Sequence, residues 1–443
     1  APMRPRYIIP DYEKFLKNGS EFLQLEPPTD FYEALNDLLI IYKHVPSVTN
    51  YPVYLGQLDY LLEPFIADID DATVKKHLKL FFTNIDRTVL DSFSHADIGP
   101  KATRAGYLIL EVQAELENAI PNISMKYDPE ITDNDFALAC VKCALKTAKP
   151  SFANHQMFKN ELGENYVIAS CYNGLLLGGG AYTLCRLILG HIAERSEGIE
   201  DFKKNKLPYV MDVMAKYMDA RIAFEVEQSG FFEANFLAKE GLIHRDRFTG
   251  MFGLVGLADA VNILMTKEGR NDRFGHSDAA TQLGVEIMDI INDFNNNHFN
   301  KYCEGTGGHF LLHAQVGIAE DKGIAPGTRI PIGEEPDELV DHLDVISHFH
   351  KYFVSGTGDI FPMDLTVHKN PEYVLDIIKG SWQKGIRYLS FYSSESDVIR
   401  ITGYLVKRSE IEKYEQGIAV LQNTTQLGTG AKHNGKILER KVR

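Results

Sequence analysis

The sequence is poor in cysteine, and the number of cysteines is odd. Only five occur in 443 residues, at positions 140, 143, 171, 185 and 303. A chain of this length buries a core without covalent cross-links, so we expect free thiols in a reducing cytoplasm rather than a disulfide scaffold. Cys140 and Cys143 form a lone C-x-x-C pair. Together with Phe136 they follow helical spacing within residues 133–149, which favours buried core thiols over half of a zinc site.

Basic runs and long apolar runs are also missing. The net charge is −15, which argues against nucleic-acid binding because that activity needs a basic surface. The longest apolar segment, residues 175–189, is interrupted by three glycines and Arg186, so we expect no membrane-spanning helix. The chain begins Ala1-Pro2-Met3 without a signal-like apolar core. We expect that an N-terminal piece precedes it.

The residues that are present indicate a large globular protein. Apolar residues make up 44% of the chain and charged residues 24%. Residues 1–130 read as mostly helical, and further helices are expected over 206–228, from about Gly253, and over 280–300. Strands are expected over 309–316, 386–392 and 398–406. Helices interleaved with short strands along the whole length favour an α/β barrel over a string of small domains.

One short segment near the C-terminus carries distinctive chemistry. The chain reads Arg400-Ile-Thr-Gly-Tyr404. A radical on a glycine Cα is delocalised over the flanking peptide groups and is best stabilised when that carbon is planar, a geometry that glycine reaches easily because it lacks a Cβ. Gly403 is therefore a candidate for storing an unpaired electron, while a plain β-bulge is the structural alternative.

A stored glycyl radical needs a partner that can attack an unactivated C–H bond, and a cysteine thiyl radical can do so. Cys171 is the candidate because it follows an apolar run, Val167–Ala169, and precedes the glycines Gly178–Gly180. A cysteine on such a turn can project into a barrel interior. The alternative is an inert buried thiol.

The two sites lie within a resemblance that covers essentially the full length of the chain. The sequence resembles the YjjI family of glycyl radical enzymes, and more distantly it is similar to the anaerobic (class III) ribonucleotide reductases. The reductase similarity includes an apolar G-x-x-G-x-x-E helix start, which corresponds to Gly253-x-x-Gly256-x-x-Asp259. The stretches that carry the YjjI resemblance are Pro5–Tyr12, Val53–Asp59, Tyr127–Thr132, Ser170–Asn173, Met251–Leu257 and Ile437–Arg440.

The resemblance implies a fold and a mechanism. It implies a ten-stranded α/β barrel in which a Cys171 finger loop and a Gly403 finger loop meet inside, with residues 1–375 forming the barrel and residues 376–443 the glycyl radical segment. It implies an oxygen-sensitive enzyme of anaerobic metabolism whose only cofactor is the radical on Gly403. A separate radical S-adenosylmethionine activase, holding the iron-sulfur cluster, would generate that radical. A homodimer is a further family expectation.

Departures from the better-known relatives leave the reaction open. Cys171 stands between Ser170 and Tyr172 rather than beside a second cysteine, as in pyruvate formate-lyase-like enzymes. Asn173 occupies the position of the glutamate base of the diol eliminases, and no cysteine follows Cys303 to build the reductases' zinc site. The expected substrate is a small polar molecule. The alternatives are a ribonucleotide-reductase-like nucleotide enzyme and a non-catalytic relative that binds a metabolite.

Several polar residues are candidates for the substrate pocket, each with a plain structural reading beside it. A histidine near a substrate radical could act as a general acid or base. We expect no metal site, because His342, His348 and His350 read as a polar helix face. We also expect that the turns Gly178–Gly180 and Gly356–Gly358 are structural. The candidate pocket residues are Asn154, His155, Gln156, Asn173, His313 and Gln315.

Overall fold

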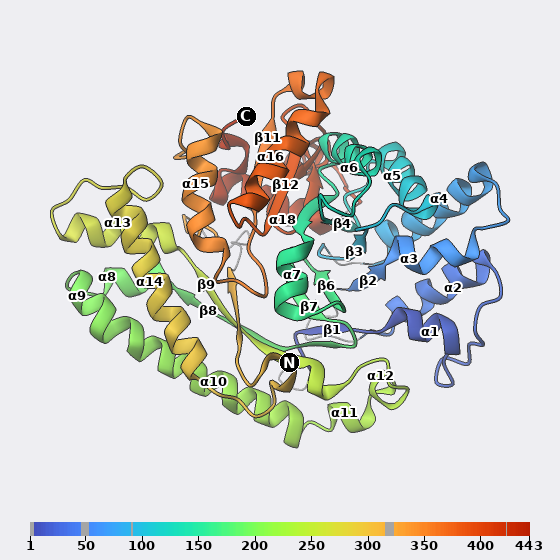
Figure 1. Ribbon diagram of the computed structural model, residues 1–443, viewed down its shortest axis with the longest axis horizontal. Helices are drawn as coiled ribbons and strands as arrows, with labels where there is room; N and C mark the ends of the chain where they lie inside the picture. The colour runs from blue at the N-terminus through green and yellow to red at the C-terminus, as the bar shows by residue number, and fades with distance from the viewer. Residues whose placement is uncertain (1–3, 46–52, 90–91, 315–322, 422) are drawn as a thin grey trace.

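The fold was analysed in a computed structural model that describes residues 4–45, 53–89, 92–314, 323–421 and 423–443 (Figure 1). Two sheets form its centre. The six-stranded sheet has the order β11-β12-β5-β4-β3-β2. Strands β2 to β5 run parallel, β12 pairs antiparallel with β5, and β11 runs parallel to β12. Its strands are β2 (Tyr54–Gln57), β3 (His95–Ile98), β4 (Asn122–Tyr127), β5 (Ser151–Asn154), β11 (Asp359–Met363) and β12 (Tyr388–Ser393).

Helices that start on capping side chains connect and cover this sheet. Asp70, Thr103 and Asp133 each accept a backbone N–H at the start of α4, α5 and α6, which satisfies donors that the first turn leaves free. Cys140 and Cys143 are buried on α6, as their spacing predicts. The helices of this half are α1 (Tyr12–Asn18), α2 (Phe31–Tyr42), α3 (Leu58–Leu62), α4 (Asp71–Thr88), α5 (Arg104–Leu116), α6 (Asn134–Thr147) and α16 (Pro371–Gln383).

The second sheet has the order β1-β8-β9-β10, with β8, β9 and β10 parallel and β1 antiparallel to β8. Its strands are β1 (Tyr7–Ile9), β8 (Gly179–Ile188), β9 (Phe248–Val255) and β10 (Leu311–Ala314). Most of its helices lie on the opposite side of the molecule from α2 to α5 in Figure 1, whereas the two short helices within residues 231–239 lie below α1. The helices of this half are α8 (Leu189–Glu194), α9 (Ile199–Asp201), α10 (Leu207–Glu227), α11 (Phe231–Ala234), α12 (Phe236–Lys239), α13 (Leu257–Lys267), α14 (Asp278–Asn297) and α15 (Leu339–His350).

Two hairpins stand apart from these sheets, and each has its own turn. The first is β6 (Tyr166–Ala169) with β7 (Asn173–Leu176), which follows α7 (His155–Leu162). The second is β13 (Val398–Arg400) with β14 (Leu405–Lys407). It leads into the C-terminal helices α17 (Arg408–Glu415) and α18 (Asn423–Gly435). The turn of the first hairpin carries Cys171, and that of the second carries Gly403.

The structure corrects three of the sequence expectations. Residues 1–130 contain strands β1 to β4 as well as helices, and residues 398–406 form a hairpin rather than one strand. Gly253 lies in β9, and the helix expected there begins only at Leu257. Every residue of β9 is buried, and a short apolar run buried on both faces cannot be told from a helix by its periodicity.

The remaining expectations about architecture are only partly tested. A hydrogen bond from Ala314 N to Gly356 O, 3.2 Å long, links the end of β10 to the loop before β11. Among the described residues no strand pairing joins the two sheets, so a closed ten-stranded barrel stays a prediction. The division at residue 375 also stays a prediction. No helix in the described ranges is long and apolar enough to cross a bilayer.

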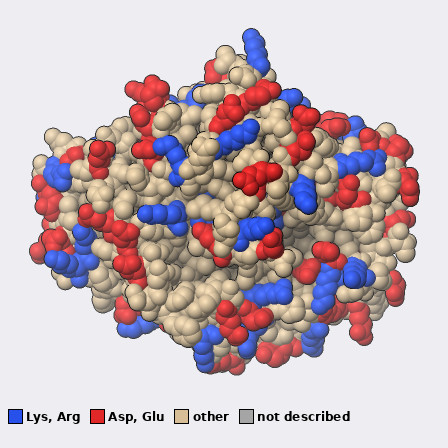
Figure 2. Space-filling view, viewed as in Figure 1, with Lys and Arg blue, Asp and Glu red and all other residues tan. Residues whose placement is uncertain are grey.

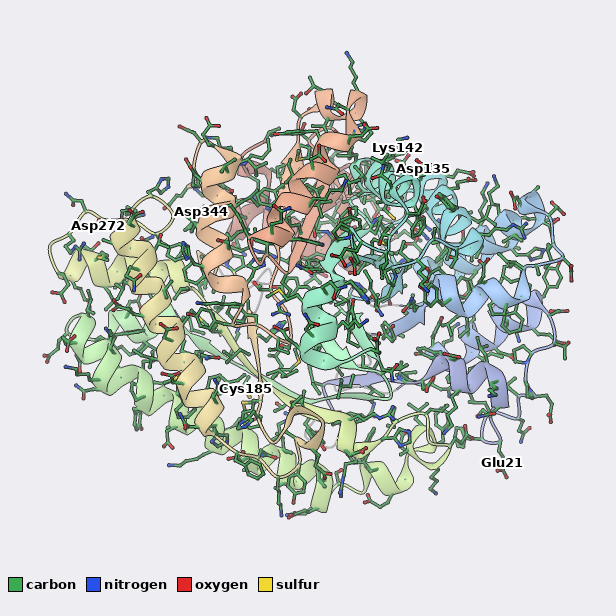
Figure 3. All side chains as sticks on the ribbon, in the orientation of Figure 1. Glu21, Asp135, Lys142, Cys185, Asp272 and Asp344 are labelled. Atoms are coloured by element: carbon green, nitrogen blue, oxygen red, sulfur yellow. The ribbon has the colours of Figure 1, made fainter. Side chains whose placement is uncertain are left out.

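Charged side chains lie at the surface in a mixed pattern. Figure 2 shows acidic and basic residues interspersed over the face in view, without a basic stripe. Figure 3 places Glu21, Asp135 and Asp272 at the rim of the molecule, whereas Cys185 lies further in, on β8.

Candidate active site

Side chains of other elements hold the Cys171 hairpin through hydrogen bonds to its main chain. Ser170, which precedes the cysteine, adopts a left-handed backbone with φ +64°, an uncommon conformation for a non-glycine residue. The Ser170 carbonyl lies 2.8 Å from His95 Nδ1. The Cys171 carbonyl accepts a hydrogen bond from the Tyr388 hydroxyl at 2.8 Å. Side chains from β3 and β12 thus fix the turn on both sides of the cysteine.

Hydrogen bonds through Ser124 connect the two anchoring side chains, His95 and Tyr388. Burial lowers the pKa of His95 to about 3, so its ring is neutral. A carbonyl can only accept, so Nδ1 carries the proton donated to Ser170 O, and Nε2 accepts from the Ser124 hydroxyl at 2.9 Å. Ser124 Oγ lies 2.7 Å from the Tyr388 hydroxyl. The cysteine turn therefore rests on a buried and uncharged hydrogen-bond network.

The Gly403 hairpin is held by charged donors instead. Asn122 Nδ2 donates to the Gly403 carbonyl at 3.0 Å. The Arg400 guanidinium orients that amide by donating to Asn122 Oδ1 at 2.7 Å, and it also donates to Ala148 O at 2.8 Å. Arg440 donates to Arg400 O at 2.6 Å and to Ile401 O. Two side chains from distant parts of the chain, Asn122 and Arg440, therefore donate to the main chain of the turn, and Arg400 holds the Asn122 amide in place.

The two turns touch each other. A Cβ added to Gly403 would overlap the Cys171 Cβ and would lie 3.1 Å from both Cα and Sγ of Cys171. Only a residue without a side chain fits against the cysteine at this distance. The structure thus brings together the two residues that the sequence analysis singled out 232 positions apart, and it places the sulfur in van der Waals reach of the glycine.

The cysteine sits in an environment that keeps its thiol protonated. Burial raises the pKa of Cys171 to about 11, although the nearby positive charges of Arg329 and Arg400 oppose that shift. Cys171 Sγ lies 3.1 Å from Asn173 Oδ1, an acceptor that suits an S–H donor. At neutral pH the sulfur therefore carries a hydrogen atom, as hydrogen-atom transfer requires, and is not a thiolate nucleophile.

Two further candidate residues lie beside the cysteine turn. Asn173 begins β7 and is fully buried, and its Nδ2 has no hydrogen-bond partner among the described residues. The His313 ring lies 5.8 Å from the Tyr172 ring, and burial lowers the pKa of His313 to about 3. His313 Nδ1 is likewise buried and unpaired within the described ranges. Gln315, the third candidate from this region, lies outside the described residues.

The remaining three candidates lie at a different place in the fold. Asn154 caps α7 and donates to Ile386 O at 3.1 Å, and Gln156 donates to Asp128 at 2.6 Å. His155 lies 2.9 Å from the Tyr166 hydroxyl and lines a pocket of about 580 Å³ with Lys126 and Tyr166. Burial lowers the pKa of His155. Of their direct partners only Tyr166, the first residue of β6, belongs to the cysteine hairpin, so a role next to Cys171 has no support from these contacts.

The other sequence motifs have structural partners. Gly178–Gly180 connects β7 to β8, and a Cβ on Gly180 would overlap Tyr7 O. A Cβ on Gly356 would overlap Tyr172 O, so this turn packs directly on the cysteine hairpin. His350 and His342 both face Asp359, at 3.2 Å and 3.7 Å. Groups of three or more metal-ligating side chains are absent from the described part of the chain.

Sequence reasoning did not assign roles to most of the residues that hold the site. Arg400 was part of the R-I-T-G-Y segment, and its position in that motif was the only available signal. Nothing local marks Asn122, His95 or Tyr388, because each acts through a contact with a segment far away in the chain. The hydrogen bond from Asn122 to Gly403, for example, spans 281 positions.

Comparisons with known proteins show the family to which the chain belongs. The family model described as glycyl radical enzyme YjjI-like matches residues 1–443. The chain is 48% identical over its whole length to an uncharacterised protein of Haemophilus influenzae, covering 86% of that protein. It is 44% identical, again over its whole length, to the uncharacterised protein YjjI of Escherichia coli K12, covering 85% of it.

Solved structures show the same fold at low sequence identity. An anaerobic ribonucleotide reductase aligns with a TM-score of 0.72 at 12% identity, covering 92% of this chain and 78% of that one. A glycyl radical enzyme from Archaeoglobus fulgidus gives 0.73 at 13%, covering 94% and 68%. The glycerol-bound form of the B12-independent glycerol dehydratase from Clostridium butyricum gives 0.71 at 13%, covering 95% and 68%. This α/β architecture is therefore that of the glycyl radical enzymes and the anaerobic reductases.

Proposed function

The chain belongs to the YjjI-like family of glycyl radical enzymes, and from this membership we propose that it stores its radical on Gly403 and attacks substrate through Cys171. The observation that carries the proposal is the contact of the two turns, in which a Gly403 Cβ would overlap the Cys171 Cβ. The residues fit such a radical. The Gly403 Cα bears no side chain, and Asn122 holds the adjoining carbonyl.

The proposed cycle moves one hydrogen atom at a time. The Gly403 radical supplies the oxidising equivalent. Cys171 gives its thiol hydrogen atom to the Gly403 Cα, and the sulfur, left with one unpaired electron, takes a hydrogen atom from a C–H bond of a small polar substrate. After the substrate radical has reacted, the same hydrogen atom returns through sulfur. Because the pKa of the Cys171 thiol is about 11, the sulfur carries its hydrogen atom at neutral pH.

Activation requires an external partner to reach a buried residue. Gly403 and its neighbours in the turn are buried, so the first hydrogen atom cannot be removed from Gly403 without movement of the hairpin. We infer that a radical S-adenosylmethionine activase, carrying its own iron-sulfur cluster, meets the Gly403 hairpin when this hairpin moves away from the sheets together with α17 and α18. A pocket of about 530 Å³ touches Ile401 and Thr402 and separates this hairpin from α13.

The alternative of a nucleotide enzyme finds less support in the local geometry. A free helix N-terminus is a natural phosphate site because its N–H groups point outward. At the start of α13, Gly256 N donates to Ala325 O at 2.9 Å and Leu257 N donates to Gly327 O at 3.1 Å. The carboxylate of Asp259 lies in the same turn and accepts from Ala325 N. These groups occupy the donors and add negative charge where a phosphate would bind.

The test is to activate the protein anaerobically with its activase and record an electron paramagnetic resonance spectrum. We expect an organic radical whose hyperfine pattern changes when glycine is deuterated at Cα. Oxygen adds to such a radical and cleaves the backbone there, so exposure to air should release a C-terminal fragment of about 40 residues, as the position of Gly403 in the 443-residue chain requires. A radical-bearing sample that stays intact in air would contradict the assignment to Gly403. Homodimerisation remains a family expectation.

A further inference from the structure

A buried arginine next to the cysteine turn forms no salt bridge within the described ranges. Arg329 is 9% exposed, and the only hydrogen bond of its guanidinium among the described residues runs from Nε to Gly358 O at 2.6 Å. A guanidinium offers five N–H donors, and burying its charge is costly unless an anion compensates it. The nearby carboxylate of Asp359 lies 3.2 Å from His350 and 3.7 Å from His342, and the charge of Arg329 helps to lower its pKa without an ion pair between the two side chains. The terminal nitrogens of Arg329 thus remain free to bind an anion.

The guanidinium lies on the flank of the cysteine turn. Its acceptor, Gly358, belongs to a loop that packs on Tyr172, and a Cβ on Gly358 would lie 3.2 Å from Tyr172 Cδ1. Arg329 Cζ lies 5.9 Å from the centre of the Tyr172 ring. Its charge is also close enough to act on Cys171, since it is the largest charge effect lowering the pKa of that thiol. The free end of Arg329 is therefore fixed near the reacting sulfur.

A second unpaired donor belongs to the side chain that the Cys171 thiol contacts. Asn173 Oδ1 is 3.1 Å from Cys171 Sγ, whereas Nδ2 of the same amide is buried without a partner among the described residues. A buried donor that lacks an acceptor costs about 1–3 kcal/mol. The Asn173 amide also acts on the buried Tyr7 hydroxyl, where it opposes the rise of the Tyr7 pKa caused by burial, but the two groups form no hydrogen bond. An oxygen atom of a bound molecule would satisfy Nδ2. The charges that act on Cys171 are those of Arg329 and Arg400, both positive, and neither forms an ion pair within the described ranges.

We propose that the Cys171 site takes a small carboxylate, held by Arg329 through a bidentate ion pair and by Asn173 Nδ2 through an oxygen substituent on its carbon chain. The terminal nitrogens of a guanidinium form a planar fork that matches the two oxygens of a carboxylate. With the carboxylate at Arg329 and an oxygen at Asn173, a C–H bond between them faces Cys171 Sγ. The use of that bond rests on the proposed function, whereas the binding itself needs no radical.

The experiment compares three carboxylates with their neutral counterparts on the full chain before activation. The pairs are acetate and ethanol, glycolate and ethylene glycol, and glycerate and glycerol, each titrated by calorimetry and by ligand-observed NMR. We expect at least one carboxylate to bind about tenfold more tightly than its neutral partner, the gain of one charge-assisted pair. Arg329→Gln should remove that difference. Arg245→Gln, which breaks a half-exposed pair with Glu304, should leave it unchanged.

A second variant keeps the test decisive if Arg329→Gln does not fold. Arg329→Lys retains the charge but not the fork, and it should weaken carboxylate binding while leaving the neutral compounds unaffected. Equal affinity within all three pairs, or carboxylate binding that survives Arg329→Gln, would overturn the proposal. So would binding of inorganic phosphate by a protein that binds none of the carboxylates. Failure to form a Gly403 radical in a protein that still binds the carboxylate would sink the proposed function alone and support this site.

Discussion

The two hairpins that meet at the site are built in different ways. The turn that carries Cys171 is anchored by the neutral groups of His95 and Tyr388, while Asp97 and Lys126 hold the main chain of β6 before it. It packs in a small cluster of its own with Phe158, Tyr166 and Tyr388. The Gly403 hairpin is anchored by Asn122 and by two arginines, and it packs in another cluster with residues of the C-terminal segment and with Ile360 and Tyr392 of the sheet. The cysteine hairpin is thus tied to strands on both sides of its turn, whereas the glycine hairpin rests on the edge of a sheet and continues into the C-terminal helices.

The difference indicates how the two residues divide their roles. The cysteine must present its sulfur to substrate in a fixed position, and a turn anchored on two strands provides that. The glycine must be reached by an activase and then return, and a hairpin with a separate hydrophobic cluster can move with α17 and α18 as one unit. We therefore expect substitutions at the two hairpins to fail in different measurements, as the following cases specify.

The largest effect is expected at Gly403. In Gly403→Ala the new methyl group would overlap the Cys171 Cβ, and overpacking of this kind costs about 1–3 kcal/mol. No stable glycyl radical should appear in the electron paramagnetic resonance spectrum after activation. Gly380→Ala on α16 is the matched control, because nothing lies within 4 Å of its Cβ position and the radical should persist. A radical in Gly403→Ala would show that another residue stores it.

Cys171→Ser should abolish turnover and spare the radical. Serine is close to isosteric, but its O–H bond is too strong to give a hydrogen atom to the glycyl radical. We expect activity to fall by more than about a thousandfold, or more than about 4 kcal/mol of activation free energy, with an unchanged radical signal. Cys185→Ser on β8 is the control and should keep both. Loss of the radical signal in Cys171→Ser alone would mean that the thiol holds the glycine turn together.

Asn122→Ala should affect the glycine hairpin before it affects the cysteine hairpin. The change removes the donor to the Gly403 carbonyl and leaves a buried Arg400 donor without its acceptor. An unsatisfied buried group of this kind costs about 1–3 kcal/mol, so we expect a lower melting temperature and a radical that decays faster. Asn118→Ala is the comparison, because Asn118 Nδ2 is buried without a partner. Equal radical lifetimes in the two variants would argue against the role of Asn122.

Two tyrosines offer a direct contrast between the hairpins. Tyr388→Phe removes the hydroxyl that holds the Cys171 carbonyl, and it should lower activity by about tenfold while the radical yield stays normal. Tyr404→Phe removes a buried hydroxyl that has no partner among the described residues, and it should be neutral or slightly stabilising. Turnover and radical yield measured together decide the point. A Tyr404→Phe defect as large as that of Tyr388→Phe would erase the proposed contrast.

The smallest effect concerns pH. Because the pKa of Cys171 is raised to about 11 from an ordinary value near 9, alkylation by iodoacetamide should be slow at pH 7 and should rise with pH until about 11. In the folded protein the thiol binds its proton more tightly than in the unfolded chain. Its contribution to stability is therefore complete below pH 9 and is lost as the pH rises toward 11. Rapid alkylation of Cys171 at pH 7 would contradict this environment.

Much of the local structure could be predicted from the sequence, and particular residues show where prediction stopped. The helix carrying Cys140 and Cys143 follows from its spacing, and the strand at residues 386–392 agrees with β12. Gly253 was assigned to a helix start because a run buried on both faces has no distinctive period. Asn154, His155 and Gln156 lie near Cys171 in sequence, yet α7 directs them to Ile386, Tyr166 and Asp128.

The sequence by itself determined which atoms can do the chemistry. A glycine without a Cβ and a cysteine with a transferable hydrogen are properties of single residues, and short motifs reveal them. Only the tertiary structure decided that these atoms touch, that Asn122 and Arg400 hold the glycine turn, and that Arg329 lies against the cysteine turn without a salt bridge. These are contacts between segments hundreds of positions apart. They form when strand pairing and burial bring the segments together, and no local pattern encodes them.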